Sequence, residues 1–578
     1  MGSVPEPAPT NERRVALQAS LRRYVPIVRW LPRYERSDLG PDLIAGLTTW
    51  GVMVPVALAY ATLAGLPPEY GLITAFAALA AYALFGTSRH LRVTTSSTMA
   101  IMSFALVTPL AGGDAMRFLA LSAALALIVG ALLIIAGVAR LGFISEFLAK
   151  PVVTGFIIGV AVTVIVRQLP KLLGIPGSSG SVFDQLRSII VHLPETDPLT
   201  LVVGGGALLL IFGLRRLDRR IPGPLVAMVL GIVAVVVFGL AEQGVAVVGE
   251  VATLMPTVGL PNVGLSDLTY LVTGAAGIVF LAVGESLGAA RSFGARHHYE
   301  IDGDQEMIAL GAANTASGLF GGFLADASLS QSATAETSGA RTQLSALVTS
   351  GLVLATALLL APLFENLAWA VLAAIIIASV LSLIDVGELR RYWAWRRTDA
   401  LLATAALIGV ATTDVLAGLV IAVLLSLLML LLRASRPYVA VLGRMPGDRA
   451  VYADLGRHPD ADAIPELLIV RLDAPLYFFN SSVTRSEIVA LVDGQPSPPR
   501  RIILDVGATA DLDVTTTDML AQLLDDLEER GVALSLAQAK GKVRDRLART
   551  GLLERIGSDG IYFSVAQAVA LEEDRLAE

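Results

Sequence analysis

Residues 283–339 read VGESLGAARSFGARHHYEIDGDQEMIALGAANTASGLFGGFLADASLSQSATAETSG and contain the features that decide the fold. The stretch begins inside an apolar run that is long enough to enter a lipid bilayer, and it places the acid Glu285 at about mid-depth. It ends in a segment, 325–339, that is too polar for a helix facing lipid. Ionisable side chains and irregular polar backbone are costly at membrane depth unless they line a cavity or are buried in protein. The stretch is therefore typical of a membrane protein that binds and moves a solute.

The composition extends this interpretation to most of the chain. Of the 578 residues, 54% are hydrophobic and 16% are charged, whereas soluble domains contain about 25% charged residues. Residues 43–432 form a series of apolar runs, and no signal-peptide pattern occurs in the first 40 residues. The chain has no cysteine, which excludes disulfides and thiolate metal sites. We predict no bound cofactor, no metal, no nucleic-acid partner and no enzymatic activity.

The apolar runs predict 14 membrane segments within a transport domain at 41–435, at about 20 residues per full span. The third segment, 93–110, begins with five consecutive Thr and Ser residues and then becomes apolar, which favours a short strand followed by a half-length helix. An even number of segments places both termini on one side. Basic clusters predict that this side is the cytoplasm; they comprise Arg22, Arg23, Arg29, Arg33, Arg36 and the basic residues within 215–220 and 390–397.

The tenth segment, 325–338, shares the hydroxyl-rich, short character of the third and lies seven segments later. An odd number of segments per repeat inverts the second copy, and inverted repeats with broken helices mark a binding site near the bilayer midplane. Two half-helix N-termini facing each other there would offer free N–H groups and positive dipole ends. This arrangement suits an anion without a buried Lys or Arg. Pro55 and Tyr60 in the first span and Glu285 in the eighth would wall the site.

The two ends of the chain lie outside this domain. Residues 1–40 predict a cytoplasmic N-terminal region, and 436–465 predict a linker with room for one edge strand. Residues 466–578 alternate strand-like and helix-like runs, which indicates a small α/β domain. This domain contains no phosphate loop, GxGxxG motif or metal cluster, so we expect it to be non-catalytic.

Several stretches resemble the SulP anion-permease family, also called solute carrier family 26, with a C-terminal STAS domain. They include DLIAGLTTWGVMVPVALAYATLAGLPPEYGL, LFGTSRHLRV, RIPGPLVAMVLG, EIDGDQEMIALGAANTASGLFGGF and, in the tail, IILDVGATADLDVTTTDML. The resemblance implies a uracil-permease-like fold, with 14 segments in two inverted seven-segment repeats. It also implies a mobile core domain that moves against a gate domain like an elevator, a homodimer and a multi-pass protein of the plasma membrane. The substrate would lie between the N-termini of segments three and ten.

The resemblance also implies the residues of the anion site, with backbone N–H groups as donors. These are Tyr60 in the first span, Thr94, Thr95, Ser96 and Ser97 in segment three, and Ala327, Ser328 and Leu329 in segment ten. Two positions depart from the family pattern. Gln331 stands where many members carry Arg, which removes a fixed positive charge, and Thr94-Thr95 replaces the usual Gly-Pro.

Glu285 matches the acidic position of the eighth span and is the predicted coupling residue. The resemblance implies that sodium-coupled bicarbonate members use an Asp at this position and a Thr four residues later. This chain has Ala289 at the second of these positions. The missing hydroxyl makes sodium the weaker hypothesis. Removal from water disfavours the charged form of a carboxyl group, so Glu285 could carry a proton instead. The alternative is that Glu285 only forms hydrogen bonds within the core domain.

These observations favour a proton-coupled secondary transporter of a small inorganic anion, with sulfate as the first hypothesis. Bicarbonate or a C4-dicarboxylate as substrate, an uncoupled anion channel and a membrane-anchored STAS regulator remain open. Other polar groups favour structural roles. His297, His298, Asp302 and Asp304 predict a solvated loop, Arg167 and Lys171 a membrane interface, and Asp326 and Glu336 either cavity lining or contact with backbone or Arg341. The turn Asp513-Val514-Thr515-Thr516 lacks the Gly of phosphorylated regulators, which argues against a phosphorylation switch.

Overall fold

The computed structural model describes residues 24–143, 150–178, 180–218, 221–251, 258–381, 383–412, 415–447 and 450–577. The chain divides into two compact units, and the boundary falls between Ser426 and Leu427. Four arginines that contributed to the predicted topology lie outside the described residues: Arg22, Arg23, Arg219 and Arg220.

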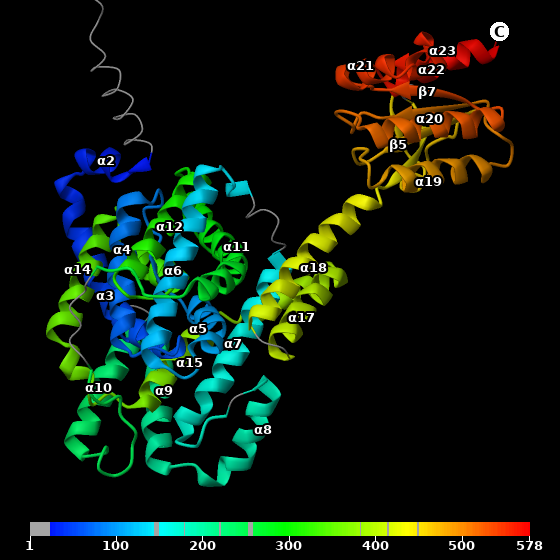
Figure 1. Ribbon diagram of the computed structural model, residues 1–578. Coiled ribbons are helices and arrows are strands. Elements are labelled where there is room, and N and C mark those ends of the chain that lie inside the picture. Colours follow the sequence, from blue (N-terminus) through cyan, green and yellow to red (C-terminus); the bar gives the residue numbers. More distant parts are fainter. Residues whose placement is uncertain are drawn as a thin grey trace, which may run out of the picture. The chain divides into compact units, whose positions relative to one another are not determined.

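The first unit is helical (Figure 1). In chain order its helices are α2 (Ile27–Trp30), α3 (Arg36–Leu63), α4 (Glu69–Phe85), α5 (Ser97–Ala111), α6 (Ala115–Val138), α7 (Lys150–Leu173), α8 (Val182–His192), α9 (Pro198–Leu217), α10 (Gly223–Phe238), α11 (Leu265–Arg296), α12 (Gly303–Leu319), α13 (Leu329–Thr337), α14 (Leu344–Leu359), α15 (Trp369–Leu381), α16 (Val386–Trp395) and α17 (Arg397–Thr412), and α18 (Val415–Ser435) crosses the boundary between the units. Helix α8 had no counterpart among the predicted segments. It is amphipathic rather than continuously apolar, and the side chains of Ser181 and Asp184 form a capping box at its start.

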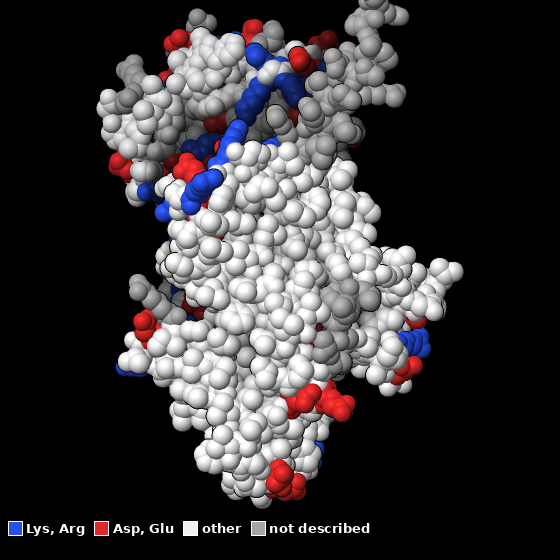
Figure 2. Space-filling view, turned by 90° about the vertical axis from the view of Figure 1, so that its left-hand side faces the viewer, with Lys and Arg blue, Asp and Glu red and all other residues white. Residues whose placement is uncertain are grey.

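The helices have the length and surface of a membrane bundle. Among the described residues, six helices are long and apolar enough to span a bilayer, and five shorter helices are also apolar. On the face shown in Figure 2, charged side chains are scarce over a broad central area and gather above and below it. Membrane insertion is therefore supported, whereas the count of 14 segments in two inverted repeats stays a prediction.

Small residues allow the helices to approach closely. Helix α12 packs against α6 and α4, and α14 packs against α3 and α4, while α7 packs against α15 and α17. A Cβ atom added at Gly71 in α4 would lie 1.9 Å from the carbonyl oxygen of Ala57 in α3. Such contacts are typical of membrane helices, in which small residues bring two backbones together.

The second unit contains a six-stranded sheet with the strand order β4-β3-β5-β6-β7-β8. Its strands are β3 (Val439–Arg444), β4 (Tyr452–Asp454), β5 (Leu467–Leu472), β6 (Arg501–Asp505), β7 (Ala533–Ala537) and β8 (Ile561–Tyr562), and its helices are α19 (Ser481–Asp493), α20 (Val514–Glu529), α21 (Gly541–Arg549), α22 (Leu552–Ile556) and α23 (Val565–Ala577). The predicted alternation of strands and helices is confirmed from residue 467 onward. Strands β3 and β4 lie within 436–465, so part of the segment expected to be a linker belongs to the sheet.

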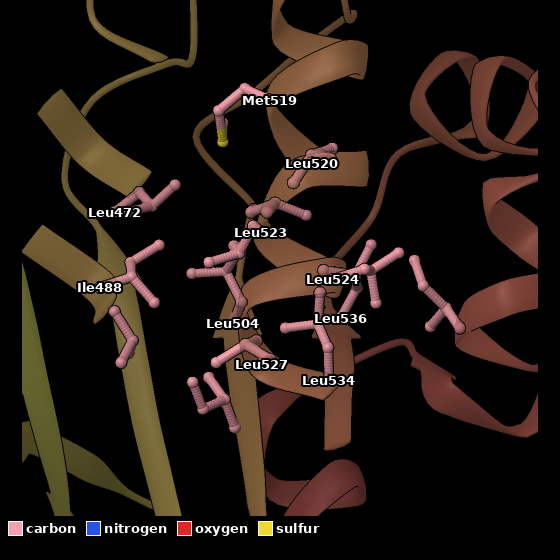
Figure 3. Packing of buried hydrophobic residues seen from close by; sticks show 14 of the residues in the cluster. Leu472, Ile488, Leu504, Met519, Leu520, Leu523, Leu524, Leu527, Leu534 and Leu536 are labelled. Atoms are coloured by element: carbon pink, nitrogen blue, oxygen red, sulfur yellow. The ribbon is translucent and has the colours of Figure 1, made fainter. Parts of the chain in front are cut away.

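Leucine-rich packing holds this sheet to its helices. Strands β5 to β8 are parallel to their neighbours, and β3 joins β5 antiparallel. Leu504 of β6 faces Leu523 and Leu527 of α20, with Ile488 of α19 beside them (Figure 3). Each of these side chains is completely buried, so the unit has a hydrophobic core of its own.

Candidate functional site

The centre of the first unit contains a pair of very short strands. Strand β1 (Val93–Thr95) pairs antiparallel with β2 (Ala325–Ala327), and Thr94 lies opposite Asp326. All six residues are buried. Strand β1 leads directly into α5 and β2 directly into α13, which confirms the predicted strand followed by a half-length helix. Because the strands are antiparallel, the two helices run away from the pair in opposite directions, and both N-terminal ends lie beside it.

The two helix starts differ in how their N–H groups are satisfied. Ser96 caps α5, because its Oγ accepts a hydrogen bond from the N–H of Met99 at 3.2 Å. Ser328 occupies the corresponding position before α13 but makes no side-chain capping bond. The first N–H groups of a helix have no partner within the helix. Those at the start of α13, from Leu329 onward, are therefore the donors best placed to receive an external acceptor such as an anion.

Backbone hydrogen bonds tie the start of α13 to the residue before β1. The N–H of Ser328 donates to the carbonyl oxygen of Arg92 at 2.9 Å. The N–H of Arg92 donates to Oγ of Ser332 at 2.8 Å, and that hydroxyl donates back to the carbonyl oxygen of Ser328 at 2.7 Å. The two half-helices are thus fixed to one strand pair.

Several buried polar atoms around the strand pair have no hydrogen-bond partner among the described residues. They are Oγ1 of Thr95 and both side-chain polar atoms of Gln331. Gln331 is completely buried, although it occupies the first turn of the polar helix α13. Native proteins satisfy nearly all buried polar groups. A cluster of unsatisfied donors and acceptors therefore indicates a place where a polar ligand and its water are bound.

Tyr60 and the remaining predicted site residues lie around the same strand pair. The hydroxyl of Tyr60, in α3, interacts with the hydroxyls of Ser97 in α5 and Ser379 in α15. Thr94 is completely buried, and its hydroxyl points to the sulfur of Met53 at 3.8 Å. The predicted residues of segments one, three and ten thus meet in one region.

Glu285 does not stand alone. Its carboxyl group lies within hydrogen-bonding reach of the carboxyl group of Asp326. The hydroxyl of Ser286 donates to Oδ1 of Asp326 and accepts the N–H of Ala327 at 3.2 Å. The structure therefore places two adjacent carboxyl groups beside the strand pair. Of the contacts considered for Asp326, the one with backbone is present, at the N–H of Ala327, whereas Arg341 pairs with Asp38.

The other polar residues considered from the sequence lie away from the strand pair. Glu336 pairs with Arg296 at 2.8 Å and with His297 at 2.6 Å. The side chain of Asp302 caps α12, and that of Asp304 accepts the N–H of Gly142. No group of three or more candidate metal ligands occurs in the described part of the chain. Arg167 lies over the ring of Phe104, Lys171 lies over the ring of Trp369, and Asp513 caps α20.

Sequence analysis missed two buried charged residues that position β1. The guanidinium of Arg92 is completely buried and donates to Oγ of Ser345 at 2.6 Å. Glu306 in α12 accepts hydrogen bonds from Tyr82 and from the loop residues Thr87 and Ser88. Both residues lie within family stretches quoted from the sequence, Arg92 in LFGTSRHLRV and Glu306 in EIDGDQEMIALGAANTASGLFGGF. A charged residue inside such a stretch was the available signal for each of them.

A histidine on the loop before β1 has a shifted titration. Burial, with His297 and Arg92 as neighbouring cationic groups, lowers the pKa of His90 to about 4. Its ring stacks on that of His297, with the ring centroids 4.2 Å apart. His90 is therefore neutral at the pH values at which an unperturbed histidine begins to gain charge.

Comparison with known proteins places this geometry in context. Residues 39–406 match the sulfate permease family, and residues 458–568 match the STAS domain. A probable sulfate transporter of Mycobacterium tuberculosis is 36% identical over 546 residues, which cover 94% of this chain and 97% of the relative. Sulfate transporter 3.1 of Arabidopsis thaliana is 31% identical over 577 residues, which cover 95% of this chain and 87% of the relative.

Solved structures resemble this chain in fold. The murine solute carrier 26 family member A9 anion transporter, in its inward-facing state, superimposes with a TM-score of 0.87 at 22% identity and covers 96% of this chain and 95% of its own. The transmembrane domain of a cyanobacterium bicarbonate transporter gives a TM-score of 0.61 at 24% identity, covering 67% of this chain and 98% of that domain.

Proposed function

The chain belongs to the sulfate permease family and carries a STAS domain, and we therefore propose that it is a secondary active transporter of sulfate. The family consists of transporters, so the chain is not an enzyme, and the resemblance inferred from the sequence is confirmed. The apolar helices of the membrane unit indicate a multi-pass membrane protein, and the family indicates that it transports an anion. Sulfate is the substrate in the names of the M. tuberculosis and A. thaliana relatives.

One observation carries the proposal for the site. Two half-helix N-termini flank a buried strand pair, and polar atoms around that pair have no partner among the described residues. An anion at this position would accept hydrogen bonds from the N–H groups at the start of α13 and gain from both helix dipoles. Tyr60, Thr94, Thr95, Ser96, Ser97, Ala327, Ser328, Leu329 and Gln331 form the proposed site.

The adjacent carboxyl groups of Glu285 and Asp326 support coupling to protons. Two carboxylates held side by side and away from water repel each other strongly unless they share a proton. Sodium receives less support, because hard cations need several oxygen ligands and two of the side chains nearest to Glu285 do not supply one. The hydroxyl of Ser286 already donates to Asp326 and accepts from Ala327, and Ala289 offers no side-chain oxygen. We therefore assign the mobile proton to Glu285.

The proposed transport cycle uses movement between helix groups. Helices α3, α4, α6, α11, α12 and α14 pack with one another, and α3, α4, α11 and α12 contact the strand pair, whereas α7, α9, α15 and α17 form a second group. The first group would act as the core domain and move like an elevator against the second, the gate domain. Fourteen segments in two inverted repeats, a homodimer, location in the plasma membrane and cytoplasmic termini complete the proposal.

Uptake of radiolabelled sulfate into proteoliposomes tests both substrate and coupling. With an inward proton gradient and no sodium, we expect sulfate to accumulate above its external concentration. Parallel samples replace the proton gradient with a sodium gradient or add bicarbonate or succinate. Accumulation of bicarbonate or a dicarboxylate without sulfate would change the substrate, and accumulation driven only by sodium would exclude the proton.

The variant Glu285→Gln tests the coupling residue. Its amide keeps the size of the side chain but cannot release a proton, so accumulation driven by the proton gradient should fall to the level of empty liposomes. Sulfate exchange at equal pH should persist, because the neutral amide mimics the protonated acid. Glu300→Gln, at an exposed acid beyond the end of α11, is the matched control. Full accumulation by Glu285→Gln would refute its role.

A further inference from the structure

A second cavity lies at the end of the helical unit where the chain enters α3. Its volume is about 1060 Å³. Three segments line it: the region from α2 to the start of α3, the loop 86–90 before β1, and the loop 339–343 before α14. We call it the entry pocket. It lies outside the predicted anion site, since none of the residues assigned to that site lines it.

The acids of the entry pocket are largely committed to neighbours within the protein. Asp38 pairs with Arg341 at 2.8 Å, Glu336 pairs with Arg296 and His297, and Asp302 caps α12. Arg29, Arg33 and Arg89 also line the pocket, and none of them forms an ion pair within the described part of the chain. Glu300, an exposed acid, lines it as well. The basic side chains of the wall that lack an ion pair therefore outnumber the acids that lack one.

Trp30 provides a donor of a different kind. It lies between Arg29 and Arg33 in the sequence and lines the same pocket. Its indole Nε1 is buried and has no acceptor among the described residues. Indole N–H groups usually find a hydrogen-bond partner when they are buried. Two arginines without an ion pair and a tryptophan whose indole N–H has no acceptor among the described residues thus belong to the wall of one pocket. A site for a phosphate group requires donors of this kind.

The surface beside the pocket is apolar. Along the first turns of α3, exposed leucine and isoleucine side chains recur on one side: Leu39, Leu43, Ile44 and Leu47 are 43–62% exposed. Val28 and Leu31, which flank Arg29 and Trp30, are also exposed. Helix α2 leads into α3 at one end of the helical unit (Figure 1). The chain thus passes within a few turns from basic side chains to the exposed apolar side of a helix that is long and apolar enough to span a bilayer.

We propose that the entry pocket binds the headgroup of an anionic phospholipid, with its acyl chains along the exposed apolar side of α3. The phosphate would accept from Arg29, Arg33 and the indole of Trp30. Basic pockets at the ends of membrane helices favour such headgroups, and each basic side chain near the surface contributes to the attraction. A lipid accounts for both the unmatched donors and the adjoining apolar surface, whereas a free phosphate accounts only for the donors.

The position of the pocket would allow a bound lipid to influence transport through the loop before β1. Its wall includes Ser88 and His90, which precede β1, and Gln343, which precedes α14. Nε2 of Gln343 donates to the carbonyl oxygens of Ser88 and Leu91 at 2.6 and 3.1 Å. A bound lipid would therefore brace the loop that holds β1, and transport should be faster in membranes that contain anionic lipid.

Lipid binding to the purified full-length protein tests this inference without relying on transport. Native mass spectrometry would count retained phosphatidylglycerol, and quenching by brominated phosphatidylglycerol would report proximity to tryptophan. The test variant is Arg29→Gln/Arg33→Gln. The matched control is Arg36→Gln, because Arg36 is exposed on the same stretch but does not line the pocket. Phosphatidylcholine vesicles with added inorganic phosphate distinguish a lipid from a free anion.

We expect the double variant to weaken phosphatidylglycerol binding about ten-fold or more, since two basic side chains are lost, and Arg36→Gln to change it less than two-fold. Trp30→Phe should abolish the strongest quenching. Equal weakening by Arg36→Gln would show a diffuse surface charge and overturn the proposal. Occupation of the pocket by inorganic phosphate in phosphatidylcholine vesicles would also overturn the proposal. So would lipid binding that appears only after residues 1–23 are removed, because the occupant of the pocket in the full chain would then be the N-terminal segment.

Discussion

Glu306 is the acid whose replacement should most clearly separate structural support from direct contact with substrate. It is 2% exposed, in the first turn of α12. Its Oε2 accepts the hydroxyl of Tyr82 at 2.6 Å, and its Oε1 accepts the N–H and hydroxyl of Thr87 at 2.6 Å and the N–H of Ser88 at 3.0 Å. Replacement by alanine would leave these donors without an acceptor inside the protein.

The expected magnitude follows from these bonds. A buried donor that loses its acceptor costs about 1–3 kcal/mol, so the loss of four such bonds in Glu306→Ala should destabilise the protein by about 4–12 kcal/mol. In Glu306→Gln the amide oxygen can still accept from Thr87 and Ser88, while the amide N–H₂ can donate to the hydroxyl of Tyr82. The loss of charge should then cost only about 1–2 kcal/mol.

Thermal unfolding of the purified protein in detergent, followed by sulfate uptake, measures both effects. Glu306→Ala should lower the unfolding temperature by on the order of 10 °C and reduce uptake, because the loop before β1 loses its anchor. Glu306→Gln should unfold within a few degrees of the parent, and Glu300→Ala serves as an exposed control. Equal damage by Gln and Ala would refute the hydrogen-bond count, and an unchanged unfolding temperature for Ala would refute the anchoring role.

Three further predictions concern packing, the strand pair and pH. Gly71→Ala should destabilise the membrane unit by about 2–3 kcal/mol or more, because its Cβ would meet the Ala57 carbonyl oxygen, whereas Gly205→Ala, with nothing within 4 Å, should leave the unfolding temperature unchanged. Ser332→Ala removes the acceptor of the Arg92 N–H and should reduce sulfate uptake about three- to ten-fold. Ser330→Ala, at an exposed neighbour, is the control. Normal uptake by Ser332→Ala together with reduced uptake by Ser330→Ala would contradict a role for the hydrogen bond between Arg92 and Ser332. The pKa of His90 is lowered to about 4 on folding, so the unfolded chain takes up the proton at a higher pH than the folded chain. The contribution of neutral His90 to the free energy of unfolding is therefore fully present above about pH 6.5 and declines as the pH falls toward 4. His90→Asn should flatten this decline in unfolding temperature, and a decline as steep as in the parent would assign it to another group.

The sequence was most informative where a segment departs from the pattern of its neighbours. The run Thr94–Thr98 interrupts an apolar series, and it predicted both the short strand and the half-length helix. The tail was predictable because its leucine-rich strands and amphipathic helices alternate with clear boundaries. Helix α8 was not predicted because its apolar residues cover only one side of a short segment. Elements could therefore be predicted where the local sequence pattern alone determines the type of structure.

The contacts within the site could not be predicted in the same way. Glu306 meets the loop before β1 across more than 200 residues of sequence, and Arg92 reaches Ser345 across a comparable distance. Asp326 was considered as a partner of Arg341, yet Arg341 pairs with Asp38 while Asp326 lies beside Glu285. Such pairings depend on which helices become neighbours, and helix packing is not encoded in the periodicity of a single segment.

The brevity of the β1–β2 pair limits how the chain can change over generations. Side chains along a strand alternate between faces, so a register shift of one residue exchanges the faces. With only three residues in each strand, an inserted or deleted residue between Arg92 and Ser96 has no length of strand over which to be absorbed. It would turn Thr94 away from its present side and misplace the start of α5. Substitutions that keep the register are therefore compatible with the strand pair, whereas a change in the number of residues here should disrupt it.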